Sequence, residues 1–335
     1  VPTSINNFNS SNADKLKYLL WENAPVEPTT DDATKLINFV RGSDSYNEVS
    51  AADEKKNNLL GGERWKLGDI FHSELKVIGI PSAKSSNSNV NSEAFYRHNN
   101  AYNGRFLYGN SCGGYCAQRK KMVYVGSNDG LLHAFDASNG NELWAFLPPM
   151  MMTKMRTAIS SKSSQSVSIY GVDGSPIVKD IYYQYKWRTV LISGLGLGGN
   201  GYFALDVTDP NNPSFLFAFS NDLVNSIVSY WDSTGHKTDR GYAGEEDFDY
   251  AYSKLGMATS TPQIVLIPYE GKQKWVAVFG AGFNAGVNDT YGSSVYVIDL
   301  ENQGKILKRI DIPDIPGNNI ANSIPAPVVA ITPDS

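Results

Sequence analysis

The stretch Val123-Tyr-Val-Gly-Ser-Asn-Asp-Gly-Leu-Leu-His-Ala-Phe-Asp136 decides the fold of this 335-residue chain. A strand of alternating residues ends at Gly126, Asn128-Asp129-Gly130 forms a tight hairpin turn, and a second strand ends at Asp136. Residues 142–146 then predict a third strand of the edge type. Short strands joined by tight turns predict an antiparallel sheet.

The same unit recurs twice further along the chain. Each copy has a buried strand that ends in Gly, an aromatic-rich strand that ends in Asp, and a third, edge-type strand. The second copy covers 189–194, 201–206 and 215–219, and the third covers 275–280, 294–299 and 305–310. The repeated Asp stands where the chain turns, so we expect its carboxylate to accept backbone N–H groups there.

A fourth strand opens each unit, at 174–180 and at 260–266, and residues 324–330 start another copy. Four antiparallel strands per repeat are typical of the blade of a β-propeller. The sequence therefore predicts an all-β fold, a β-propeller of four-stranded antiparallel blades. Residues 67–80 are the expected opening strand of the first unit. The ring does not close within these residues by this count, so further segments or non-repeat segments must supply strands.

The domain organisation follows from where the repeat begins. Residues 1–66 form a short, partly helical N-terminal segment that packs on the propeller or leads into it, and residues 67–335 form the propeller. The segments 12–21 and 30–42 have helical spacing, and the second has Thr30 as a candidate N-cap and Gly42 at its end. An insertion at about 221–256 lengthens the interval between the second and third units.

Composition excludes several classes of function. The chain has 19% charged residues, 12% aromatic residues and a net charge of −5, which argues against a broad nucleic-acid-binding surface. No apolar run approaches 18 residues, so we expect no transmembrane segment in this chain. No signal peptide is visible, and the chain starts abruptly at Val1, so we expect a processed or excised fragment.

The two cysteines, Cys112 and Cys116, flank a Gly-Gly-Tyr turn. The glycines allow the sharp bend that a short disulfide ring needs, so we expect a disulfide and an oxidising compartment. Free thiols or a metal site are the alternatives, although the nearest histidine is His98.

The segment 194–199, Gly-Leu-Gly-Leu-Gly-Gly, matches a dinucleotide-binding fingerprint. That site needs a helix next, whereas residues 201–206 are expected to form a strand, so we interpret the glycines as a turn within a blade. The segment 123–144 resembles the repeat motif of quinoprotein propellers, in which Asp136, Gly140 and Trp144 would dock neighbouring blades. A quinoprotein-like dehydrogenase is therefore an alternative hypothesis, but its catalytic carboxylate and cation ligands cannot be assigned.

The sequence shows no other catalytic constellation. The four histidines share no ligand spacing, and His133 lies in the middle of a strand, where a packed or hydrogen-bonded histidine is expected. No nucleophile–base motif is present, so we expect no enzyme activity.

Calcium is the cofactor that the residues favour, because Glu245, Glu246, Asp247 and Asp249 gather four hard carboxylate ligands within five residues. A solvated acidic loop is the plainer alternative. The oxygen donors of residues 87–93 form a second, less charged candidate.

Several segments together resemble the PilC/PilY family of type IV pilus-associated adhesins. They cover about 35–332 in the family's order: 65–73, 123–136, 170–176, 194–210 and 278–284. The resemblance implies a non-enzymatic domain with a modified β-propeller fold that acts in type IV pilus biogenesis, retraction control and host-cell attachment. It implies a virulence-related protein that is secreted across the inner membrane and found at the pilus tip, the outer membrane or the cell surface. Some members bind calcium in an Asp-rich loop of a later blade, and some bind integrins through Arg-Gly-Asp, whereas here Arg240-Gly241 precedes Tyr242.

The partners that we expect are a host-cell surface receptor, minor pilins, or both. An assembly scaffold that docks minor pilins is the second alternative hypothesis. The candidate binding surface is the insertion, whose aromatic side chains would act as anchors. These residues are Tyr230, Trp231, Tyr242, Phe248 and Tyr250. The competing interpretation is that they pack the insertion onto the propeller.

Overall fold

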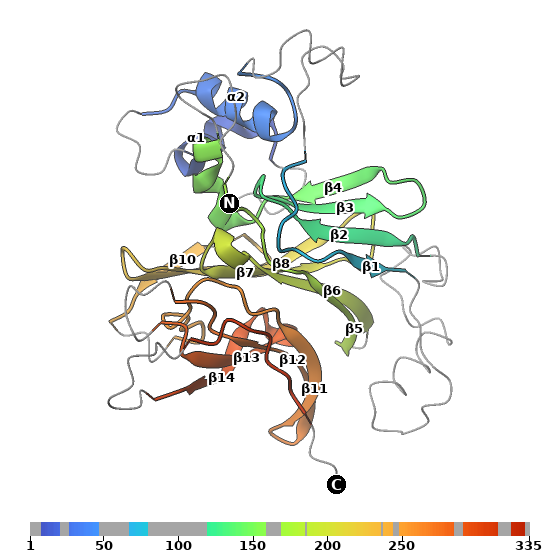
Figure 1. Cartoon of the computed structure of the whole chain (residues 1–335), viewed down its shortest axis with the longest axis vertical. Helices are drawn as coiled ribbons and strands as arrows, with labels where there is room; N and C mark the ends of the chain where they lie inside the picture. Colours follow the sequence, from blue (N-terminus) through green and yellow to red (C-terminus); the bar gives the residue numbers. More distant parts are fainter. Residues whose placement is uncertain are drawn as a thin grey trace.

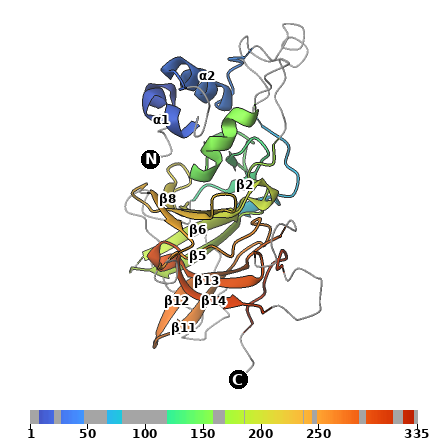
Figure 2. The same cartoon turned by 90° about the vertical axis from the view of Figure 1, so that its left-hand side faces the viewer.

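The computed structural model describes residues 8–20, 27–46, 67–79, 119–158, 169–184, 186–235, 237–243, 248–284, 291–313 and 323–331. Within these residues, three antiparallel sheets follow one another along the long axis of the molecule, with the helices at one end (Figures 1 and 2). We call the sheets blades 1, 2 and 3. The predicted fold class, all-β with propeller-type antiparallel sheets, is confirmed.

The strands of each blade are named here with their bounds. Blade 1 contains β1 (Lys76–Ile78), β2 (Met122–Gly126), β3 (Leu132–Asp136) and β4 (Glu142–Phe146). Blade 2 contains β5 (Ile177–Tyr183), β6 (Lys186–Gly194), β7 (Gly201–Asp206), β8 (Ser214–Asp222), β9 (Ile227–Trp231) and β10 (Lys237–Gly241). Blade 3 contains β11 (Gln263–Tyr269), β12 (Lys272–Gly280), β13 (Ser294–Asp299) and β14 (Lys305–Asp311).

Three expected strands differ from the structure. Residues 324–330, expected to open another copy, contain only an isolated bridge between Ile324 and Gly282. The opening strand predicted over 67–80 is reduced to β1, because the residues before it bond to side chains instead of to a neighbouring strand. The third strand of the second unit, β8, is not an edge strand, because the insertion adds β9 and β10 beyond it. The turn between Asp222 and Ile227 joins β8 to β9, and three hydrogen bonds from Val224 and Asn225 to the Asp222 carboxylate fix that turn.

The opening strands β1, β5 and β11 lie along the same side of the three blades in Figure 1, and β5 contacts both of the others. The Lys179 ammonium on β5 donates a hydrogen bond of 3.0 Å to the Ile264 carbonyl on β11. The Arg119 guanidinium bonds to the Gly79 carbonyl beyond β1 and to Thr189 on β6. The opening strands are therefore the inner strands, arranged about one axis as in a propeller.

The repeated aspartates Asp136, Asp206 and Asp299 are buried at the ends of β3, β7 and β13. Each carboxylate accepts the backbone N–H two residues later, at 2.9, 3.0 and 2.9 Å, as the sequence predicted. Each is also paired with a cation on or before the preceding strand, which is Lys120, Arg188 or Lys274. In all three blades the strand register shifts, as at a β-bulge, between the two residues directly before this Asp. The three turns are therefore equivalent.

The repeated glycines Gly126, Gly194 and Gly280 end β2, β6 and β12, and backbone crosses each of them. A Cβ atom on these glycines would overlap with the carbonyl oxygens of Val172, Ala258 and Ile324, respectively. Glycine is required here because the segment that leads to the next blade lies directly on the strand end.

The Gly-rich loop after β6 forms a short 3₁₀ turn, η5 (Gly196–Gly198), and β7 begins at Gly201. Gly196 has a φ of +58° and Gly199 a φ of +153°, which a residue with a side chain rarely adopts. No helix follows the loop, so the interpretation as a blade turn is confirmed and a dinucleotide site is excluded there.

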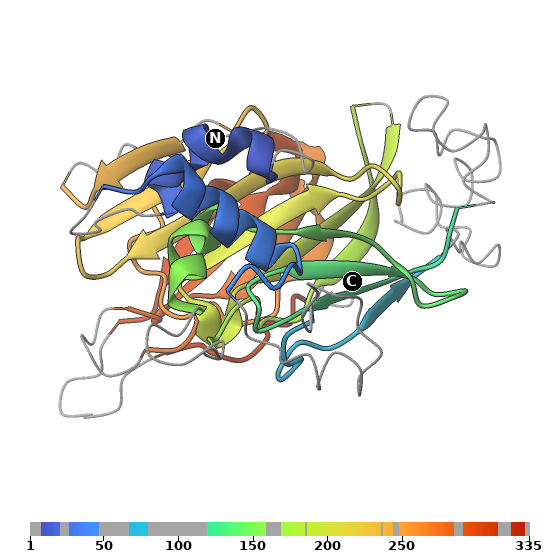
Figure 3. The same cartoon turned by 90° about the horizontal axis from the view of Figure 1, so that it is seen from above.

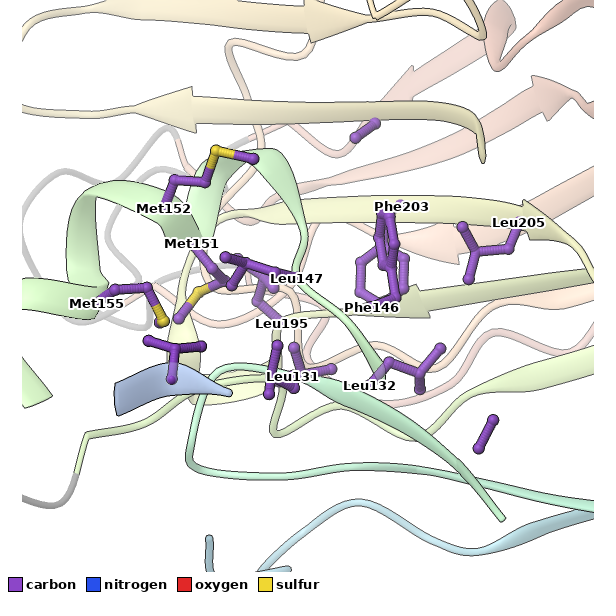
Figure 4. Close-up of a cluster of buried hydrophobic side chains, with 14 of the residues drawn as sticks. Leu131, Leu132, Phe146, Leu147, Met151, Met152, Met155, Leu195, Phe203 and Leu205 are labelled. Atoms are coloured by element: carbon purple, nitrogen blue, oxygen red, sulfur yellow. The ribbon is translucent and has the colours of Figure 1, made fainter. Parts of the chain in front are cut away.

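Two apolar cores hold the blades together. The first lies between blades 1 and 2 and the helices, and Figure 4 shows its Leu, Met and Phe side chains converging. The second lies between blades 2 and 3 and is mostly aromatic. The Trp144 indole on β4 donates a hydrogen bond of 2.8 Å to the Pro210 carbonyl of blade 2, which confirms its predicted docking role between blades.

The helices cover the first core from outside. They are α1 (Ala13–Leu20), α2 (Thr30–Val40) and the 3₁₀ segment η4 (Pro149–Ala158), and a short turn η2 (Ser10–Asn12) precedes α1. Viewed from above, α1 and α2 lie over strands of blade 2 (Figure 3). Thr29, not Thr30, is the N-cap of α2, because Asp32 three residues later completes a capping box with it. None of the helices among the described residues has the length and apolarity to cross a membrane.

Candidate interaction surfaces

Residues 67–75, which we call the leading strap, run along blade 1 before β1 and are held by side chains. The Asp129 carboxylate accepts the Gly68 N–H at 2.9 Å, and the Asp173 carboxylate accepts the His72 N–H at 3.2 Å. The Ser73 hydroxyl accepts the Gly126 N–H at 2.9 Å, and the Ser175 hydroxyl accepts the Glu74 N–H at 3.1 Å. The strap is therefore fixed at several points to blade 1 and to the segment that leads to blade 2.

The strap exposes large apolar side chains although its backbone is fixed. Phe71 is 66% exposed, and its ring contacts the His72 imidazole edge-on with 4.3 Å between centroids. Leu67, Ile70 and Leu75 are exposed beside it. Apolar groups on an ordered backbone lose little conformational entropy when a partner covers them, so the strap has the properties of a docking surface.

His133 bonds to the same Asp129 carboxylate that holds the leading strap. Its Nε2 lies 2.9 Å from the Asp129 carboxylate that holds Gly68, and its Nδ1 lies 2.5 Å from Glu142. Burial by itself lowers the pKa of His133, but the hydrogen bonds to Asp129 and Glu142 outweigh it and raise the pKa to about 9. The imidazole is therefore a buried cation between two carboxylates, which confirms the prediction of a hydrogen-bonded histidine.

The aromatic residues of the insertion lie differently from the expected exposed surface. Tyr230 and Trp231 on β9 are each only 5% exposed, Tyr230 in the second core and Trp231 in the first. Burial raises the pKa of the Tyr230 hydroxyl, which donates to the Gln303 carbonyl at 3.0 Å. The prediction that these two side chains are surface anchors is wrong, because alternate residues of β9 point into the two cores on either side of blade 2.

The other three predicted anchors are partly buried against the second core. Tyr250 stacks on Tyr230 at 3.8 Å, and Phe248 meets Tyr250 edge-on at 5.4 Å. The Tyr242 hydroxyl donates to the Asn221 amide oxygen at 2.6 Å. Their contacts agree with the competing interpretation, that the aromatic residues pack the insertion onto the propeller.

Asp249 is the described member of the predicted carboxylate cluster. It is exposed and forms an ion pair of 2.9 Å with Lys305 on β14. Glu245, Glu246 and Asp247 lie outside the described residues, as do the donors of 87–93. Calcium binding therefore stays a prediction. In the part of the chain that the structure describes, no three His, Cys, Asp or Glu side chains gather to hold a metal ion.

Cys112 and Cys116 also lie outside the described residues, so the predicted disulfide stays a prediction. Of the histidines, His72 lies on the strap and His133 in blade 1, and the other two are outside the described residues.

Sequence reasoning missed the leading strap as a surface. Its signal was available, because Ile70-Phe71 is an apolar pair between Gly68-Asp69 and His72-Ser73, without the alternation that a half-buried strand needs. The run was instead interpreted as the start of the first strand.

Comparisons with known proteins place this arrangement in a family. The profile described as the PilY1 beta-propeller domain matches residues 108–331. The type IV pilus biogenesis factor PilY1 of Pseudomonas aeruginosa (strain UCBPP-PA14) is 26% identical over 98% of this chain and 25% of its own length. A PilY1 homolog of Xylella fastidiosa is 35% identical over 59% of this chain and 16% of its own length.

The crystal structure of the Pseudomonas aeruginosa PilY1 C-terminal domain is 30% identical, with a TM-score of 0.41 over 63% of this chain and 34% of that domain. The chain thus spans about a quarter or less of the length of these two curated relatives, which are named as pilus biogenesis factors. Since the profile covers about two thirds of the residues, the chain belongs to the PilY1 family of type IV pilus proteins.

Proposed function

We propose that this domain is a non-enzymatic binding module of the type IV pilus machinery, and that its leading strap docks a protein partner. The names of its relatives support a role in pilus biogenesis. The function extends to retraction control and host-cell attachment, at the pilus tip or outer membrane after secretion across the inner membrane. The partner is a minor pilin, a host-cell surface receptor, or each in turn.

One observation supports the strap most strongly. Phe71 and Ile70 are exposed on a backbone that Asp129 and Asp173 hold from blade 1 and from the segment leading to blade 2. Interface hot spots are often aromatic side chains presented on a rigid frame, and they account for most of the binding free energy. A single aromatic truncation at such a site costs about 2 kcal/mol or more, which is roughly a 30-fold loss of affinity.

The experiment compares Phe71→Ala with Tyr18→Ala. Tyr18 is the matched control because it is an exposed aromatic residue on α1, with 56% of its surface accessible. We expect Phe71→Ala to weaken capture of purified minor pilins or attachment to epithelial cells at least 10-fold, while Tyr18→Ala does not. The assay that responds identifies the partner class. Unchanged capture and unchanged attachment by a folded Phe71→Ala variant would contradict the proposal.

We also propose calcium binding at the acidic loop that ends in Asp249. The carboxylate chemistry supports it, and the ion pair with Lys305 would compete with the ion. Calcium should raise the thermal midpoint of the chain but not that of the quadruple variant with Gln and Asn at Glu245, Glu246, Asp247 and Asp249. An equal rise in both would place the ion elsewhere, and no rise would exclude it.

A further inference from the structure

The described chain contains the dipeptide Asn-Gly in two opposite surroundings. Asn139-Gly140 lies in the turn between β3 and β4, and Asn200-Gly201 lies where the Gly-rich loop enters β7. A glycine directly after an asparagine leaves the asparagine side chain open to attack by the next backbone nitrogen, because glycine has no Cβ atom in the way. The two sites share this intrinsic reactivity, so the fold decides which of them reacts.

The first site is open. Asn139 and Gly140 are both exposed. A Cβ atom on Gly140 would meet no atom within 4 Å, so a new ring has space to form there. The Gly140 N–H donates to the Asp136 carbonyl at 2.8 Å, and water can replace this bond when the exposed turn opens locally.

The Asn139 side chain is folded back over the Gly140 peptide. Its Oδ1 accepts the Asn141 N–H at 2.9 Å, in a turn that asparagine side chains form with their own backbone. The same hydrogen bond draws electron density from the amide carbon and makes that carbon a better electrophile. In the part of the chain that the structure describes, no hydrogen bond holds the Nδ2 group, which is the leaving group.

The second site is closed. The Asn200 Nδ2 donates to the Asn221 carbonyl at 3.2 Å, and the Asn200 carbonyl accepts the Asn221 N–H at 2.8 Å. Gly201 is buried and pairs with Ser220 in the ladder between β7 and β8. A Cβ atom on Gly201 would lie 2.7 Å from the Phe219 carbonyl oxygen, so ring closure at this site requires β7 to open first.

We propose that Asn139 is a site of spontaneous covalent modification, at which the chain forms a cyclic imide and releases ammonia. The Gly140 backbone nitrogen gives its proton to water and bonds to the Asn139 side-chain amide carbon. The bond from that carbon to Nδ2 breaks, and Nδ2 takes up a proton and leaves as ammonia. Water then opens the imide at one of its two carbonyl carbons and leaves either an aspartate or an isoaspartate at position 139. The inference does not depend on the proposed function.

The isoaspartate product lengthens the turn, because the backbone then runs through the side chain and gains one carbon atom. Three backbone hydrogen bonds close this turn, and all of them involve Asp136: its N–H donates to the Asn141 carbonyl, and its carbonyl accepts the N–H groups of Asn139 and Gly140. The strand that follows is β4, whose Trp144 bonds to blade 2. Modification therefore adds a negative charge to the turn and loosens β4.

Peptide mapping by mass spectrometry of the 335-residue chain, incubated at mildly alkaline pH and body temperature, measures each Asn-Gly pair separately. The third pair, Asn103-Gly104, lies outside the described residues. We expect Asn139 to lose its amide at least about 10-fold faster than Asn200 in the folded chain, because Asn200 reacts only after local opening. In urea, the two rates should lie within about 3-fold of each other, because the fold no longer protects either site.

Equal rates in the folded chain, or a faster reaction at Asn200, would overturn the proposal. A difference that persists unchanged in urea would overturn it as well, because the neighbouring sequence and not the turn would then cause the difference.

The matched control for the loosening of β4 is Asn139→Ser, whose hydroxyl can accept the Asn141 N–H but which has no amide to lose. The isoaspartate fraction of the incubated chain is separated by ion exchange and identified with an isoaspartyl methyltransferase. Its amide exchange in 142–146 should be at least about 10-fold faster than in the equally incubated Asn139→Ser variant. Equal exchange in the two proteins would show that the product does not loosen β4.

Discussion

The two junctions between blades share one frame but are filled by different side chains. The junction between blades 1 and 2 is largely aliphatic and methionine-rich, and helices close it from outside. The junction between blades 2 and 3 is an aromatic stack, in which Phe219 lies 3.6 Å from Tyr252 with parallel rings and Tyr202 lies 4.4 Å from Phe279. The glycine crossings and buried aspartates are the same in both. These shared backbone features, which we call the frame, therefore set the spacing of the blades, and different side chains can fill the space between them.

The largest effect is expected where the aromatic junction loses its central ring. Phe219→Ala should lower the free energy of unfolding by about 3–5 kcal/mol, because Phe219 is fully buried and contacts several rings. Urea unfolding measures the change. The control is Phe71→Ala, an exposed residue whose truncation should stay within about 0.5 kcal/mol. Equal losses in the two variants would show that the stack does not support the junction.

The second prediction concerns the pH dependence of stability that His133 causes. This residue of blade 1 stands at the register position where blade 2 has Phe203 and blade 3 has Tyr296. The folded pKa of His133, about 9, lies above its ordinary value of 6.5. The stabilisation is therefore fully present below pH 6.5 and is lost as the pH rises through about 9, at most about 3 kcal/mol. Urea unfolding between pH 6 and 9.5 should show this loss.

The control for that pH dependence is His133→Gln, which removes the titrating group from between Asp129 and Glu142. Its unfolding free energy should change less over the same pH range than that of the unaltered chain. If both proteins lost stability in parallel, another group would be responsible.

The shared frame is tested by Gly194→Ala against Gly241→Ala. A Cβ on Gly194 would lie 2.5 Å from the Ala258 carbonyl, so backbone must move and unfolding should become easier by about 1–3 kcal/mol. Gly241 has no neighbour within 4 Å of a Cβ and is the matched control. Thermal unfolding of both variants is the measurement. A midpoint for Gly194→Ala equal to that of the control would remove the argument for close crossing.

The smallest effect is expected for the loss of one hydrogen bond between blades 1 and 2, the one that Trp144 donates. Trp144→Phe keeps most of the ring area but loses the bond to the Pro210 carbonyl, so we expect a cost of about 1 kcal/mol. Trp275→Phe is the counterpart in blade 3, where the indole donates to the Tyr182 carbonyl at 3.1 Å. Trp275 is more deeply buried, so its substitution should cost more, and a reversed order would show that the aliphatic junction depends more on this bond than the aromatic one.

The repeating parts of the fold were predictable from sequence because each rests on local chemistry. An Asp at a strand end, a Gly at a crossing and alternation along a strand give the same signal in every copy. This is why the three units, the turn at 128–130 and the aspartate caps were predicted correctly. The helix predicted over 30–42 is α2 over 30–40, and its N-cap is Thr29 instead of Thr30 because the two threonines are adjacent and both can cap.

The misplaced features depend on contacts that are distant in sequence. Whether Tyr230 and Trp231 face water or a core depends on the helices and blade 3 packing on either side of β9, which the insertion's own sequence does not contain. Residues 67–75 lack a strand partner because Asp173, about a hundred residues away, takes one of the N–H groups. The candidate site was therefore less predictable than the fold.

The six-stranded sheet of blade 2 shows where this architecture tolerates growth. β9 and β10 are added beyond β8, at the periphery, so the inner strand β5 and its neighbours about the axis are undisturbed. New sequence can thus lengthen a blade outward by a hairpin while the contacts among the inner strands stay in place, although side chains of the added β9 also enter the two cores between blades. We therefore expect related propellers to differ mostly in the number of strands at the outer edge of a blade, and to keep the inner strands that lie about the axis.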